Sequence, residues 1–165
     1  MRHIISILLQ NEAGALARVA NMFSSRGFNI ESLNVAPTNH PTVSRLTLVT
    51  VGSDEVIDQI SKQLGRLVDV VNIVDMTDGD HIERELALFK LQIKATERAG
   101  LTKLISDAGG RMLDDHEGHF TVELIGSAQD IDRFLVKVGK LAEILTVVRS
   151  GAMAVARGMP VLSPT

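Results

Sequence analysis

Along the first 76 residues, segments with the two-residue alternation of a β-strand take turns with segments that have the spacing of an amphipathic helix. Residues 3–9 predict a strand with Ile5, Ile7 and Leu9 on one face, because strand side chains point alternately to the two sides of a sheet. The same reasoning predicts two helices and three more strands, over residues 14–26 and 54–66 and over residues 28–36, 42–51 and 67–76.

The resulting order, β-α-β-β-α-β, is typical of a ferredoxin-like module: a four-stranded antiparallel sheet with two helices on one face. The other face of that sheet is expected to be uncovered. Together with the sheet edges, it is a natural place for a partner.

After a polar, turn-rich stretch the order repeats. We expect a strand over residues 85–95 and a helix over residues 97–108. A hairpin around Glu117-Gly118 should then join strands over residues 111–115 and 119–126. Ser127 can cap a second helix, and a last strand is expected over residues 143–149. The sequence therefore predicts an α+β fold of two tandem ferredoxin-like (βαββαβ) modules. Their expected bounds are 1–76 and 85–150, with a linker over 77–84 and a C-terminal tail, 151–165, as the least structured part.

Composition excludes several classes of protein. A hydrophobic content of 45% over 165 residues is enough for packed cores, but aromatic residues make up only 3%. With a net charge of -3 and no basic stripe, nucleic-acid binding has little support. The absence of cysteine excludes disulfides and thiolate chemistry. No apolar run approaches the ~20 residues of a membrane span and no signal peptide is evident, so a cytoplasmic protein is expected.

The most informative stretch follows the first strand, where Asn11-Glu12-Ala13-Gly14-Ala15-Leu16 leads into a helix. Backbone N–H groups near Gly14, Ala15 and Leu16 have no partner within the helix and attract a carboxylate or phosphate. Gly14 lets a ligand approach because it has no Cβ, and Asn11 offers both a donor and an acceptor. On local sequence alone, an ordinary strand-to-helix turn explains the same residues.

Residues suited to catalysis or metal binding are sparse. His116 and His119 form a weak metal candidate, but Gly118 favours a hairpin turn and thus a solvated polar loop. Ser24-Ser25 has no evident histidine partner. The chain is therefore expected to have no catalytic residues.

The run from Leu9 to Leu33, with Asn11, Gly14 and the segment Arg26-Gly27-Phe28-Asn29-Ile30, resembles the ACT domain. More closely, it is similar to the regulatory small subunits of acetolactate synthase (acetohydroxyacid synthase). Three further stretches resemble the same family, at residues 35–38 with Ser44-Arg45, at 62–70 and at 84–88.

The resemblance implies a regulatory subunit of branched-chain amino-acid biosynthesis with no catalysis of its own. It implies that the chain activates a large catalytic subunit, which carries thiamine diphosphate, Mg²⁺ and FAD, and confers feedback inhibition by valine. It also implies a homodimer of side-by-side ACT domains with the effector at their interface. One wall of that site would be formed by Asn11, Gly14, Ala15 and Leu16, and the facing wall by Asn29 and Ile30.

Two other interpretations stay open. The chain can be a free-standing amino-acid-sensing ACT module that regulates another enzyme or transcription, although the lack of a basic DNA-reading element argues against direct control of transcription. The second of these interpretations is a small enzyme on a ferredoxin-like scaffold, and the lack of an acid–base or nucleophile pair argues against it. Leucine and isoleucine remain alternatives to valine.

Overall fold

The computed structural model describes residues 1–164 and divides into two compact units. The first unit holds residues 1–82 together with the C-terminal segment from Ala152 onward, and the second holds residues 83–151. Within the described part of the chain, no helix is both long and apolar enough to cross a membrane.

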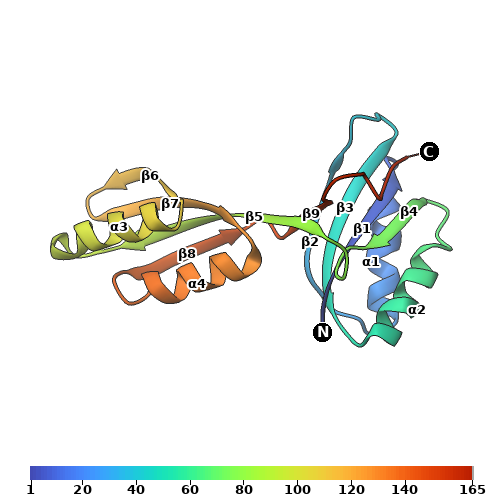
Figure 1. Ribbon diagram of the computed structural model, residues 1–165, viewed down its shortest axis with the longest axis horizontal. Helices are drawn as coiled ribbons and strands as arrows, with labels where there is room; N and C mark the ends of the chain where they lie inside the picture. Colours follow the sequence, from blue (N-terminus) through green and yellow to red (C-terminus); the bar gives the residue numbers. More distant parts are fainter. Residues whose placement is uncertain (165) are drawn as a thin grey trace. The chain divides into compact units, whose positions relative to one another are not determined.

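The first unit has the predicted βαββαβ order. Its elements are β1 (Arg2–Gln10), α1 (Ala15–Ser25), β2 (Ile30–Pro37), β3 (Val43–Val51), α2 (Asp54–Leu64) and β4 (Val70–Asp75). The strands form an antiparallel sheet in the order β2-β3-β1-β4, and α1 and α2 lie together against it (Figure 1). Strand β4 begins later than residue 67, because Leu67 N and Val70 N donate in successive turns to Leu64 O and Leu67 O.

The core of this unit lies between the sheet and the two helices. Ile5, Ile7 and Leu9 are buried there, as their alternation predicts. They pack in one cluster with Phe23 of α1 and Ile60 of α2. Burial of aliphatic side chains on this scale is the main force that stabilises the unit.

The second face of the first sheet is covered by the C-terminal segment, which includes β9 (Met153–Ala156). Ala152 and Ala154 pack in one cluster with Ile4 of β1, and Leu162 packs against Leu8. Figure 1 shows this segment in dark red beside β1 and β3. The expectation of an uncovered face is therefore wrong for the described residues. Of the expected C-terminal tail, 151–165, Met153–Ala156 form a strand, and residues 157–164 have no helix or strand.

Two side chains of the sheet hold the backbone of this segment. Asn34 Nδ2 donates to Ala152 O over 2.8 Å, and Arg45 Nη2 donates to Ala154 O over 2.8 Å. The segment is ordered because small residues at alternate positions fit against apolar side chains that β1 and β3 present on this side.

The second unit repeats the order. Its elements are β5 (His81–Gln92), whose first two residues belong to the first unit, the 3₁₀ turn η1 (Ala95–Glu97), α3 (Arg98–Asp107), β6 (Arg111–His116), β7 (His119–Gly126), α4 (Ala128–Val138) and β8 (Glu143–Arg149). The sheet order is β6-β7-β5-β8, and β9 pairs with β5. Its core contains the buried side chains of Phe89, Phe120 and Phe134, and the ring centroids of Phe89 and Phe134 are 5.2 Å apart.

Strand β5 begins at His81, so the expected linker over 77–84 is shorter than predicted. The reason is a tertiary contact. Strand β9 pairs with β5, and Arg157 N donates to Asp80 O just before β5 begins. A polar stretch whose sequence predicts a linker thus forms part of a strand, because a partner strand supplies hydrogen bonds to its backbone N–H and C=O groups.

Candidate functional site

The turn between β1 and α1 is held by backbone hydrogen bonds from two directions. Gln10 N donates to Asp69 O over 2.8 Å, and Asn11 N donates to Thr42 O over 2.8 Å. The Asn11 side chain donates through Nδ2 to Pro41 O over 3.2 Å. Its side-chain oxygen has no partner among residues 1–164 and is free to accept a hydrogen bond.

Helix α1 starts without a side-chain cap. Gly14 occupies the N-cap position with φ 87, a left-handed conformation that residues with a Cβ rarely adopt. The first helical hydrogen bond runs from Arg18 N to Gly14 O over 3.0 Å. The N–H groups of Leu16 and Ala17 therefore have no acceptor in the described chain and remain available at the positive end of the helix dipole.

Arg18 lies directly beside this turn. Its Nη2 donates to Asp69 Oδ1 over 2.8 Å, and its Nε donates to Asp69 Oδ2. The Asp69 side chain is 6% exposed and that of Arg18 is 46% exposed. The hydrogen bond from Arg18 lowers the pKa of the Asp69 carboxyl below its usual value, so the pair stays charged at neutral pH.

The sequence interpretation missed Arg18 and Asp69. A usable signal existed, because a cation in the first turn of a helix is disfavoured by the helix dipole unless an acid compensates it. The identity of that acid was not predictable, since Asp69 is 51 residues away along the chain.

The second predicted wall lies at the other end of α1. Asn29 O accepts a hydrogen bond from Thr50 Oγ1 over 2.6 Å, and its side chain is exposed. Ile30 is half-buried at the start of β2, which among residues 1–164 pairs only with β3 and is an edge strand of its sheet. Because the 11-residue helix separates them, the two walls are about 16 Å apart within one chain.

The structure thus brings Asn11, Gly14, Ala15 and Leu16 together in one turn but does not bring Asn29 and Ile30 to them. Ala15 is buried beneath the turn, and Leu16 is 38% exposed. A small ligand cannot touch both walls of the same chain. The assignment of all six residues to one site stays a prediction, and it requires a second copy of the chain.

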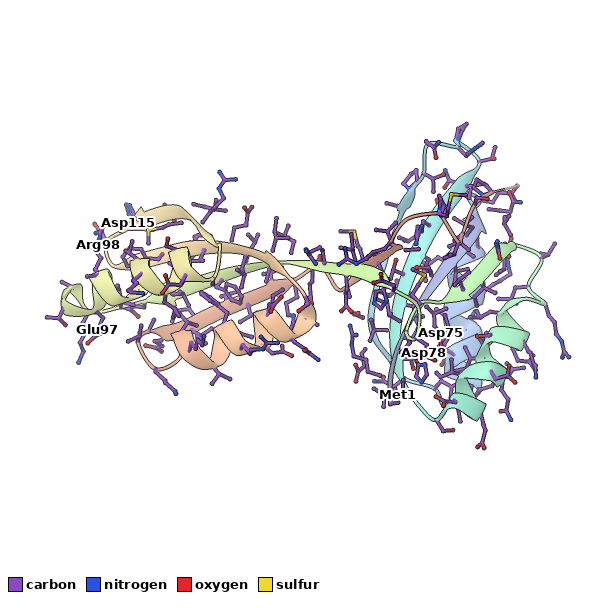
Figure 2. All side chains as sticks on the ribbon, viewed as in Figure 1. Met1, Asp75, Asp78, Glu97, Arg98 and Asp115 are labelled. Carbon is purple, nitrogen blue, oxygen red and sulfur yellow. The ribbon has the colours of Figure 1, made fainter. Side chains whose placement is uncertain are left out.

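The hairpin that carries His116 and His119 is a tight turn, as predicted. Glu117 and Gly118 have φ values of 51 and 83. Nearby carboxylates already have cationic partners, since Asp115 is paired with Arg98 (Figure 2) and Asp114 lies 3.4 Å from Lys90 Nζ. Among residues 1–164 there is no group of three or more ligands that can hold a metal ion.

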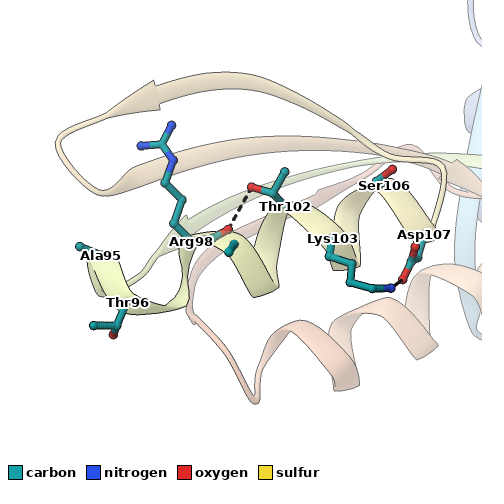
Figure 3. A pocket seen from close by; sticks show the side chains of 8 residues that line it. Ala95, Thr96, Arg98, Thr102, Lys103, Ser106 and Asp107 are labelled. Carbon is teal, nitrogen blue, oxygen red and sulfur yellow. Dashed lines mark hydrogen bonds and ion pairs between the residues drawn. The ribbon is translucent and has the colours of Figure 1, made fainter.

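Two surface hollows lie in the second unit, and none of the predicted effector residues lines them. One runs along the outer side of η1 and α3 (Figure 3). Some of its polar groups bond to one another, because Thr102 Oγ1 donates to Arg98 O and Lys103 Nζ donates to Asp107. The other lies between α3, α4 and β7.

A buried histidine marks the other end of the first sheet. His3 is 2% exposed, and its Nδ1 lies 3.0 Å from Asp75 Oδ2. Burial disfavours ionisation of Asp75, but hydrogen bonds from Thr77 and His3 outweigh it and lower the pKa of the carboxyl. Thr77 also accepts a hydrogen bond from Ile4 N. These contacts tie the ends of β1 and β4 together, which is a structural role.

Comparison with known proteins decides the family. Residues 5–72 match the profile described as the AHAS small subunit-like ACT domain, and residues 84–158 match the profile of the small subunit of acetolactate synthase. The acetolactate synthase isozyme 3 small subunit of Escherichia coli is 44% identical over 158 residues, which is 96% of this chain and 97% of that protein.

The chain belongs to the acetolactate synthase small subunit family. The small subunit from Haemophilus influenzae is 42% identical and covers 96% of this chain and 97% of that protein. The crystal structure of the small subunit from Thermotoga maritima superposes with a TM-score of 0.85 at 30% identity, over 96% of this chain and 99% of that one. The prediction of an ACT domain followed by a second ferredoxin-like unit is confirmed.

Proposed function

We propose that this chain is the non-catalytic regulatory subunit of an acetolactate synthase. It binds the large catalytic subunit, raises its activity and makes it sensitive to feedback inhibition by valine. The family assignment supports a small subunit, and the uncapped start of α1 at Gly14 supports a site for a carboxylate in its ACT domain. Thiamine diphosphate, Mg²⁺ and FAD are expected on the catalytic partner, not on this chain.

The proposed ligand is an amino acid because the turn supplies the matching groups. The free N–H groups of Leu16 and Ala17 can donate to a carboxylate. The side-chain oxygen of Asn11 can accept from the ammonium. The side chain of Leu16 is 38% exposed and offers apolar contact to a branched aliphatic group. A slot of this kind distinguishes one methylene by only ~1–3 kcal/mol, so valine, leucine and isoleucine are expected to compete.

The proposed site is completed by a second copy of the chain. Strand β2 is an edge strand, and its outer side has no partner strand within the described residues. An edge of this kind can pair with the same strand of a second copy around a two-fold axis. Such pairing brings Asn29 and Ile30 of the second copy toward the turn that holds Asn11 and Gly14.

Inhibition then requires that valine bind one arrangement of the dimer more tightly than another. The arrangement that valine favours must support the catalytic subunit less well. A coupling of 1–3 kcal/mol, which is usual for allosteric pairs of sites, is about 5- to 150-fold in affinity.

The function is tested with the full chain and the large subunit from the same organism. Affinity capture should recover the thiamine-dependent synthase, and the purified chain alone should form no acetolactate. In the reconstituted enzyme the chain should raise activity, and valine should reduce it. Capture of a different enzyme, or activation without any response to valine, leucine or isoleucine, would contradict the proposal.

The site is tested with Gly14→Asp, which places a Cβ and a negative charge where the carboxylate should bind. We expect the half-inhibiting concentration of valine to rise more than about tenfold while activation is retained. Gly109→Asp is the matched control, because Gly109 has φ +71, no atom within 4 Å of the added Cβ, and lies in the second unit. If both variants respond to valine like the unmodified chain, the site assignment is wrong.

A further inference from the structure

The Arg18 side chain is held in an unusual way for a half-exposed arginine. It rises from the first turn of α1, where the helix dipole disfavours a cation. The Asp69 carboxylate, 6% exposed, accepts hydrogen bonds from its Nε and Nη2. This two-point contact fixes the plane of the guanidinium and leaves Nη1 with no hydrogen-bond partner among residues 1–164.

The free end of the guanidinium lies next to the glycine that starts the helix. A Cβ atom on residue 14 would be only 2.8 Å from Arg18 Nη1, and the guanidinium carbon would be 3.4 Å away. The conformation of Gly14 and the position of Arg18 therefore depend on each other. Three donors at the start of α1 thus have no acceptor within residues 1–164: Nη1 of Arg18 and the N–H groups of Leu16 and Ala17.

We propose that Arg18 binds the carboxylate of the effector through Nη1, and that Asp69 is the positioning residue that aims it. This inference rests on the proposed function and adds the residue that makes the site select for a carboxylate. Two carboxylate oxygens offer about four acceptor positions, which suits three donors. Because Asp69 compensates most of the arginine charge, the contribution of Arg18 is a directed, charge-assisted hydrogen bond.

A merely structural ion pair makes a different prediction from a recognition residue. If Arg18 only stiffens the turn, its loss weakens every ligand of the site by the same factor. If Nη1 contacts the carboxylate, its loss weakens valine more than valinamide, which keeps the side chain and the ammonium but has a neutral amide. Both amines are largely protonated at about pH 6.5.

The experiment measures binding of valine and of valinamide to the full chain by titration calorimetry. In Arg18→Gln we expect the Kd for valine to rise at least about tenfold and the Kd for valinamide at most about threefold, so the preference for valine falls. Asp69→Asn should lower the same preference by a smaller factor, because Arg18 is then present but no longer aimed. Arg133→Gln, an exposed arginine on α4, is the control and should change neither Kd.

Arg18→Lys is a second variant that distinguishes lost recognition of the carboxylate from a folding defect. It keeps the charge but cannot form the two-point contact with Asp69 while presenting a third donor, so it should also lose preference for valine. Equal weakening of both ligands in Arg18→Gln and Arg18→Lys would overturn the Arg18 assignment and leave the proposed function intact. Failure of the unmodified chain to bind any branched-chain amino acid would instead overturn the proposed function, and the Arg18 assignment with it.

Discussion

The two units of this chain have the same β-α-β-β-α-β order but use the second faces of their sheets differently. In the first unit that face is buried under the C-terminal segment, and Ile4 and Leu8 are 1% and 2% exposed. In the second unit the register places Leu88 beside Val148 and Leu86 beside Ile125 on the side away from the core, where Val148 is 56% and Ile125 is 58% exposed. One fold therefore supports both a two-layer and a three-layer arrangement.

The units also differ where their helices begin. Helix α1 starts at an uncapped glycine, whereas α4 starts at a capping box in which Ser127 and Asp130 satisfy each other's backbone N–H groups. Helix α3 is preceded directly by the 3₁₀ turn η1 and has Glu97, not a glycine, at its N-cap position. The same order of helices and strands therefore does not by itself produce the same helix starts in the two units. The first unit combines an open glycine turn with a neighbouring arginine.

The largest expected effect is in the second unit, at the ion pair between Arg149 and Glu85. Arg149 donates from Nε and Nη2 to the Glu85 carboxylate, which is only 4% exposed. Arg149→Met leaves this carboxylate buried and unpaired, and we expect a loss of about 3 kcal/mol in the free energy of unfolding. Hydrogen exchange should show the loss in β5 and β7 and much less in the first unit. The double variant with Glu85→Leu should recover most of it.

The packing of the C-terminal segment on the first sheet is tested with substitutions of two neighbouring residues. Leu162 is 7% exposed against Leu8 and Val43, whereas Val161 is 54% exposed. Leu162→Ala should lower the free energy of unfolding of the first unit by about 2 kcal/mol, and Val161→Ala should change it by less than about 0.5 kcal/mol. Equal effects in urea unfolding would show that the C-terminal segment does not pack on this face in solution.

A smaller effect is expected at the start of α4. Ser127→Ala removes the hydroxyl that accepts from Asp130 N over 3.2 Å and should cost about 1 kcal/mol. Ser53→Ala at the start of α2 should cost less, because Val56 N lies 3.4 Å from Ser53 Oγ and α2 has no capping box. Thermal unfolding of the two variants measures the difference. A larger loss in Ser53→Ala would contradict the ranking.

The smallest effect concerns the pH dependence of the Arg18–Asp69 pair. The folded-state pKa of Asp69 is lowered by Arg18, so the unfolded chain binds the proton more tightly. The pair therefore stabilises the first unit above the unfolded pKa of about 4, and this contribution is lost as the pH falls through the lower, folded value. The stability difference between the unmodified chain and Asp69→Asn should shrink below about pH 4. A difference independent of pH would contradict this.

Much of the candidate site was predictable because it is local. The start of α1 was expected at residue 14, and the helix begins at Ala15. The roles of Asn11 and Gly14 in this turn follow from neighbours in sequence, where chain geometry leaves few alternatives. The partner of Arg18 was not predictable, because a periodic pattern carries no information on which distant acid approaches a given helix.

The amino-acid sequence by itself determined the type and order of the elements and the α-helix start that carries the uncapped amides. These depend on side-chain periodicity and on turn residues, which act over a few positions. Only the tertiary structure decided that the C-terminal segment covers the first sheet and that Asp69 holds Arg18. Those contacts join residues 109 and 51 positions apart, as between Arg45 and Ala154 and between Arg18 and Asp69. They form because the folded sheet presents a second apolar face and a buried carboxylate, neither of which exists before the strands assemble.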